Sequence, residues 1–278
     1  MFVLALFIVA GLILLAVVHP NVRSQWRLAY CMRKAHPYER LECLLPYFED
    51  LVHQSSARKA IAYAQALQRI GIIDDCHLAA HAIGEANLVA HQFDTGAAFA
   101  SCSSACFEGC HHAVMEGYLA RARDLSSALD GVRTLCSSVA QDTLLYRQCL
   151  HGVGHGILRH GAVILPEAVD LCQRLGDAFA VDTCLGGVFM ENVDRYLTKD
   201  EKTVFALLPG LCTPITHHPQ LFESCIEAVG EGMMFYTGHD LPRSEALCRS
   251  LPENSQEWCI AAARQEALIN EAAARDIH

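Results

Sequence analysis

Apolar residues divide the chain into a long N-terminal apolar run and a series of helical blocks. Met1–Val18 holds only apolar residues, and as a helix it would be ~27 Å long, close to the ~30 Å hydrocarbon core of a bilayer. We therefore predict a transmembrane helix and assign residues 1–20 to an N-terminal membrane anchor. The exit from this run, Ala16 to Pro20, fits a signal-peptidase site poorly, which favours an uncleaved anchor over a cleavable signal peptide.

Beyond the anchor, one sequence block returns five or six times. A Leu-Cys pair is followed, eleven to thirteen residues later, by a second cysteine and small residues. These second cysteines lie 34 to 41 residues apart and are Cys76, Cys110, Cys149, Cys184, Cys225 and Cys259. This period is typical of stacked helical hairpins. An alanine or glycine three residues after each cysteine indicates that neighbouring helices cross at close range.

The repeats predict the fold class. We expect an all-α protein, an α-solenoid of about six to seven helical hairpins that follows one transmembrane helix. No Pro/Ser-rich linker or change of composition interrupts the series. Residues 21–278 should therefore form a single helical-repeat domain.

Fourteen cysteines, an even number at regular spacing, predict disulfides. Five pairs would each link the two helices of a hairpin: Cys31–Cys43, Cys136–Cys149, Cys172–Cys184, Cys212–Cys225 and Cys248–Cys259. Each would contribute roughly 3 kcal/mol. The other four, Cys76, Cys102, Cys106 and Cys110, can be joined in three ways. We prefer Cys102–Cys110 with Cys76–Cys106, but the sequence does not decide between the three.

In plan, these hairpins resemble the disulfide-stapled helical repeats of the Sel1-like and tetratricopeptide class, over about residues 24–275. The resemblance is one of architecture. The aromatic and glycine signatures of those families are missing, so no functional residue is carried over from them.

Charge and cysteine content bear on the partners and the compartment. The net charge is −10 and no basic run stands out, so we expect no nucleic-acid partner. Arg23, Arg27, Arg33 and Lys34 follow the apolar run and by themselves would place the body in the cytoplasm. Disulfides persist outside the reducing cytosol. We give the cysteines more weight and place the body outside the cytoplasm, periplasmic or extracellular, although the basic residues conflict with this.

Histidine and glutamate follow the same repeat in this histidine-rich chain. The pairs two and six residues after a repeat cysteine are His112 with Glu116, His151 with His155, and Glu227 with Glu231. Side chains four residues apart share a helix face, so the pairs of successive repeats should form a stripe. Imidazole and carboxylate groups on adjacent helices can bind a transition metal such as zinc, iron or copper. The predicted ligands are His77, His81, Glu85, His112, Glu116, His151 and His155.

Two other interpretations of these residues remain open. The histidines of Cys-x-x-Gly-x-x-His-Gly can be part of how the repeat packs, bonded to carbonyls of the previous turn. Cys106-Phe-Glu-Gly-Cys110-His111 is a variant of a c-type haem attachment site, but the strict Cys-x-x-Cys-His is absent and we expect no haem.

The leading hypothesis is thus a membrane-anchored, extracytoplasmic repeat protein that binds a transition metal. No hydrolase elbow, phosphate-binding loop or His-Glu-x-x-His occurs, so the catalytic residues are unknown. If the protein is an enzyme, we expect a metal-dependent oxidase or hydrolase with Glu85 or Glu191 as a nearby acid or base. The alternative is a scaffold whose concave face binds a protein or peptide, with structural histidines.

Overall fold

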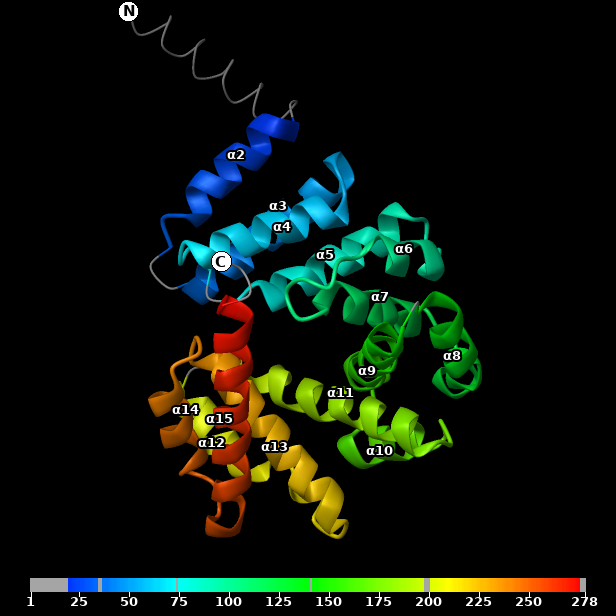
Figure 1. The fold of residues 1–278 in the computed structure, drawn as a ribbon, viewed down its shortest axis with the longest axis vertical. Coiled ribbons are helices and arrows are strands. Elements are labelled where there is room, and N and C mark those ends of the chain that lie inside the picture. Colours follow the sequence, from blue (N-terminus) through cyan, green and yellow to red (C-terminus); the bar gives the residue numbers. More distant parts are fainter. Residues whose placement is uncertain (1–19, 35–36, 74, 141, 198–200, 276–278) are drawn as a thin grey trace, which may run out of the picture. The chain divides into compact units, whose positions relative to one another are not determined.

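The computed structural model describes residues 20–34, 37–73, 75–140, 142–197 and 201–275 (Figure 1). These residues form fourteen α-helices, α2 to α15, with two short 3₁₀ helices and no β-strand, which confirms the all-α class. The transmembrane helix predicted for the N-terminal run lies outside the described residues. Among the helices that are described, none combines the length and the apolar character that a membrane span needs.

The described chain falls into two compact units, with the boundary in the sequence between Val114 and Met115. Unit 1 contains α2 (Pro20–Cys31), α3 (Pro37–Gln54), α4 (Ala57–Arg69), α5 (Cys76–Ala90), α6 (Thr95–Ser101) and the first turns of α7 (Gly109–Ala120). Helix α3 packs against α2, α4 and α5. Its side chains Leu44 and Phe48 are fully buried in this core.

Unit 2 holds the rest of α7 and the helices α8 (Leu125–Val139), α9 (Thr143–His160), α10 (Leu165–Gln173), α11 (Ala178–Leu197), α12 (Glu201–Leu207), α13 (Pro219–Tyr236), α14 (Leu241–Cys248) and α15 (Glu253–Arg275). The long helices α9, α11, α13 and α15 each pack on the next, and the short helices α8, α10 and α14 each pack on the long helix that follows. This confirms helical hairpins as the local plan. The solenoid and the single repeat domain stay predictions.

All fourteen cysteines form disulfides. The five pairs expected within hairpins are present. The four remaining cysteines adopt the preferred connectivity, Cys76–Cys106 with Cys102–Cys110. In α8/α9, α10/α11 and α14/α15, each disulfide joins a short helix to the long helix after it, so the hairpins are covalently closed.

Aspartates begin several of these helices. The side chains of Asp75, Asp94, Asp124, Asp142 and Asp240 each accept a hydrogen bond from a backbone N–H of the first turn. Such N-caps satisfy donors that the helix itself leaves unpaired. They determine where α5 and α9, the helices that carry most of the clustered histidines, begin.

Small residues let the long helices touch through their backbones. A Cβ atom at Gly187 of α11 would collide with the carbonyl oxygen of His151 on α9, and one at Gly154 of α9 would collide with the carbonyl oxygen of Cys184. In unit 1, Gly84 of α5 lies in the same way against the carbonyl of Cys110 and against Ala113. The close crossing predicted three residues after a repeat cysteine is thereby confirmed at Gly187 and at Ala113.

Candidate metal centre

Three buried histidines come together in unit 1. His77 and His81 lie one turn apart on α5, and His112 lies near the start of α7. Each offers a ring nitrogen within 4.8 Å of the others, and the ring centroids are 4.7, 5.5 and 5.7 Å apart. The crossing of α5 and α7 at Gly84 brings the rings together. We call these residues the three-histidine cluster.

The tautomer of a neutral His77 follows from its contacts. Its Nδ1 lies 3.0 Å from the backbone carbonyl oxygen of Cys106, which can only accept a hydrogen bond. Nδ1 must therefore carry a proton, and in the neutral imidazole Nε2 then keeps its lone pair. That Nε2 faces the Nε2 of His81 at 3.1 Å. Metal-binding histidines are commonly oriented in this way, with the second ring nitrogen donating to a carbonyl.

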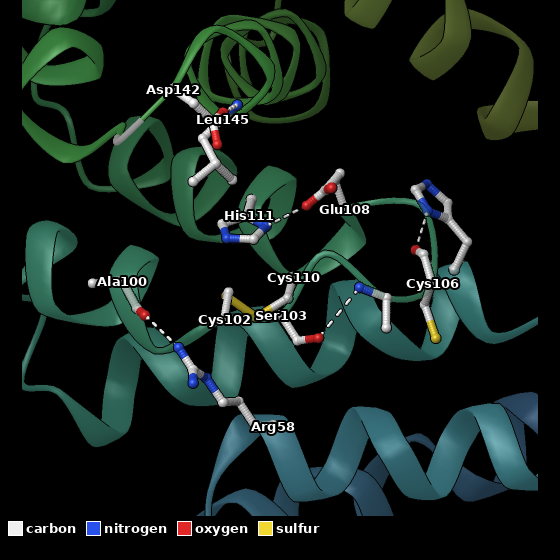
Figure 2. Close-up of polar contacts among 12 residues, drawn as sticks. Arg58, Ala100, Cys102, Ser103, Cys106, Glu108, Cys110, His111, Asp142 and Leu145 are labelled. Atoms are coloured by element: carbon white, nitrogen blue, oxygen red, sulfur yellow. Dashed lines mark hydrogen bonds and ion pairs between the residues drawn. A yellow bond between two sulfur atoms is a disulfide. The ribbon is translucent and has the colours of Figure 1, made fainter. Parts of the chain in front are cut away.

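The carbonyl that holds His77 belongs to an unusual turn. Cys106, Phe107 and Glu108 all have left-handed backbone angles, with φ of 59°, 51° and 60°, a conformation that costs roughly 1–2 kcal/mol for each non-glycine residue. The disulfides Cys76–Cys106 and Cys102–Cys110 close the chain on either side of it. The contact at the Cys106 carbonyl and the Cys102–Cys110 bond are drawn in Figure 2.

The same turn leads into α7 through a buried contact between a histidine and a carboxylate. Nδ1 of His111 lies 2.8 Å from the Glu108 carboxylate, and both side chains are almost fully buried. The His111 ring also packs on Phe99 of α6, with centroids 4.5 Å apart. Figure 2 shows Glu108 and His111 side by side at the beginning of the helix. These contacts anchor the first turn of α7, which carries His112.

A second group of ionisable side chains lies in unit 2, between α9 and α11. His155 is fully buried, and its Nε2 lies 3.2 Å from the Nε2 of His151, one turn earlier on α9. Its Nδ1 lies 3.2 Å from Oε2 of Glu191 on α11. His155, Glu191 and Asp194 each offer a ligand atom within 4.8 Å of the others, and we call them the carboxylate–histidine cluster.

Negative charge surrounds His155. Burial by itself lowers the pKa of this imidazole, but the hydrogen bond to Glu191 and the charges of Glu116, Glu191 and Asp194 outweigh it, so that the pKa is raised. Glu116 is paired with Arg159 at 2.8 Å. The surroundings of His155 thus favour a positive charge in this position, carried by a proton or by a metal ion.

The structure places the predicted metal ligands in different surroundings. His77, His81 and His112 meet in unit 1, and the unit 2 pair His151 and His155 lies ring to ring. Glu116 is fully buried in an ion pair with Arg159. Glu85 is exposed on α5 and belongs to neither cluster.

The sequence analysis did not predict Asp194 of the carboxylate–histidine cluster, and it gave Glu191 a different role. Asp194 was not predicted, and Glu191 was considered as an acid or base but not as a ligand. Their spacing of three residues, which places both on one face of a helix, was the available signal.

No protein-family model, no curated protein and no solved structure matches this chain. The resemblance to helical-repeat families therefore stays a prediction. Function has to be inferred from the chemistry of the two clusters, whose buried histidine and carboxylate groups can hold a metal ion.

Proposed function

We propose that this chain is a membrane-anchored, extracytoplasmic helical-repeat protein that binds a transition metal ion through the three-histidine cluster. One observation carries the proposal. Three buried imidazoles converge, and the contact of His77 with the Cys106 carbonyl leaves its Nε2 lone pair directed at the other rings.

The spacing of the ring nitrogens supports this proposal. With Zn–N bonds of about 2.0–2.1 Å, two nitrogen ligands of a tetrahedral zinc ion lie roughly 3.3 Å apart, and the Nε2 atoms of His77 and His81 are 3.1 Å apart. Without metal, an N–H of one ring can donate to the Nε2 of the other. A metal ion needs neutral imidazoles and competes with protons for the ring nitrogens, so its affinity should fall as the pH is lowered.

Three nitrogen ligands would leave one position of a tetrahedral ion open. Structural zinc sites use four protein ligands, whereas catalytic sites keep a position for water or substrate. Zinc, copper and iron all accept imidazole ligands. The ligand number therefore supports the enzymatic version of the proposal, a metal-dependent hydrolase or oxidase, over a purely structural ion.

The disulfides and α2 support the placement at the outer side of a membrane. Seven disulfides need an oxidising compartment. Trp26 and Tyr30, one turn apart on α2, are 64% and 60% exposed, and they follow the apolar run closely in the sequence. Aromatic side chains at such positions commonly lie in the membrane–water interface.

The test is zinc titration of the full-length, metal-stripped protein in detergent, followed by calorimetry. The double variant H77A/H81A should lose high-affinity binding, because it removes two of three ligands. The matched control is H217A/H218A, which removes two adjacent histidines that are exposed in a turn and should bind as the wild type does. Equal binding by both variants, with helicity retained in each, would refute the proposal.

A further inference from the structure

The geometry of the carboxylate–histidine cluster follows from a close backbone contact between α9 and α11. Gly187 lies against the carbonyl oxygen of His151, with no room for a Cβ atom. One turn further along both helices, Glu191 therefore meets His155, and the Nδ1–Oε2 distance is 3.2 Å. Asp194 follows on the same face of α11 and completes the group.

Acidic charge is concentrated in this region. Glu191 and Asp194 each offer a carboxylate oxygen within 4.8 Å of a ring nitrogen of His155. His155 is fully buried, Glu191 is 5% exposed and Asp194 is half-buried, so water does little to screen the charge of Glu191. Buried carboxylates are costly unless a proton or a cation compensates them. A divalent ion between His155, Glu191 and Asp194 would supply more of that compensation than a single proton does.

We propose that the carboxylate–histidine cluster is a second metal site, distinct in its chemistry from the three-histidine cluster, and that it takes a harder divalent ion, Mn²⁺ or Fe²⁺. This rests on the proposed function in so far as the protein binds metal at all. Oxygen ligands favour manganese and ferrous iron, whereas an all-imidazole set suits zinc and copper. The ligands are Nδ1 of His155 and the carboxylates of Glu191 and Asp194.

His151 has an orienting role in this arrangement. With Nδ1 on the metal, the proton of His155 is on Nε2 and is donated to the Nε2 of His151, 3.2 Å away. A hydrogen bond from the second ring nitrogen fixes the tautomer and the ring plane of a metal-binding histidine. His151, predicted as a ligand from the repeat, thus becomes a positioning residue for His155.

The test uses Mn²⁺ as the probe, because the electron paramagnetic resonance signal of the free aqueous ion disappears on binding. The full-length, metal-stripped protein should bind about one Mn²⁺, and D194N should weaken this binding by about tenfold or more, since it removes a charged ligand. E191Q is a second variant with the same expected effect. D130N is the control, because Asp130 is an exposed carboxylate paired with Arg174.

The Mn²⁺ binding of the wild type and of the variants either supports or contradicts a second metal site. Mn²⁺ bound by the wild type and by H77A/H81A, and lost in D194N and E191Q but not in D130N, supports a second site. Loss of Mn²⁺ in H77A/H81A would contradict a separate site, and so would absence of Mn²⁺ binding in the wild type or equal binding by D194N and D130N. Zinc titration of D194N reports on the three-histidine cluster separately, so that failure of this site and failure of the proposed function are distinguishable.

Discussion

At the scale of single residues, the backbone around His77 determines what its side chain can do. Its amide N–H donates to Asp75 at 2.8 Å, and its Nδ1 donates to the Cys106 carbonyl. Gly109 packs so closely that a Cβ atom there would lie 2.8 Å from the His77 carbonyl oxygen and 3.1 Å from Nδ1. The orientation of the imidazole therefore depends on residues outside the three-histidine cluster.

We expect G109A to lower both the thermal stability and the zinc affinity of the protein, because the added methyl group must displace the backbone or the ring of His77. G131A is the matched control. Gly131 lies inside α8, and a Cβ atom added there would have no neighbour within 4 Å, so alanine should stabilise the helix by up to about 1 kcal/mol and leave zinc binding unchanged. Thermal unfolding and zinc titration measure both effects, and identical behaviour of the two variants would contradict this account of His77.

A buried carboxyl in unit 2 should make stability depend on pH. Burial, together with the charges of Glu266 and Glu227, raises the pKa of Glu231 from 4.5 to about 7 against the opposing effect of Arg147. The folded state thus binds the proton more tightly than the unfolded state does. This group should destabilise the protein progressively as the pH rises from 4.5 to 7, with no further loss above that.

The variant E231Q should remove this component, because glutamine is uncharged throughout the range. Denaturant unfolding of wild type and E231Q at about pH 4.5, 6 and 7.5, values that span the shifted titration, provides the measurement. A stability difference between the two proteins that does not change with pH would show that Glu231 is ionised normally in the folded state.

At the scale of elements, the left-handed turn at residues 106–108 couples the disulfides to the three-histidine cluster. It contains no glycine, which is why the sequence did not predict it. The hairpins and their disulfides were predictable, because a pair of cysteines eleven to thirteen residues apart in a helix–turn–helix is a local feature.

Glu85 lies outside both clusters for a geometric reason. Eight residues along a helix correspond to a rotation of about 80° from His77, which turns Glu85 towards solvent.

Removal of the Cys76–Cys106 disulfide should therefore weaken zinc binding as well as stability. In C76S/C106S the turn can relax and the Cys106 carbonyl can leave His77. C172S/C184S is the comparison, since it opens a disulfide of unit 2 at the α10/α11 hairpin. Each loss should cost roughly 3 kcal/mol, measured by denaturant unfolding, but zinc affinity should fall only in C76S/C106S. A similar zinc affinity in both would separate the turn from the metal centre.

At the scale of the whole molecule, repetition predicted the helices but not the full ligand sets. His77, His81 and His112 could be found because each lies at a defined distance from a repeat cysteine. Asp194 could not be found in that way, because its contact with His155 depends on how α9 and α11 cross at Gly187. Contacts of this kind, between residues far apart in the chain, are difficult to predict from a single sequence. The solenoid and the membrane anchor remain predictions from the repeat period and from the apolar run.

The central claim, that this protein binds a transition metal, is tested most directly by elemental analysis of the untagged, full-length protein purified from an oxidising compartment. We expect about one equivalent or more of zinc, iron or copper for each chain, retained through gel filtration. A folded protein with all disulfides formed that contains no transition metal, and takes up none when it is offered, would contradict the claim and leave the buried histidines a structural role.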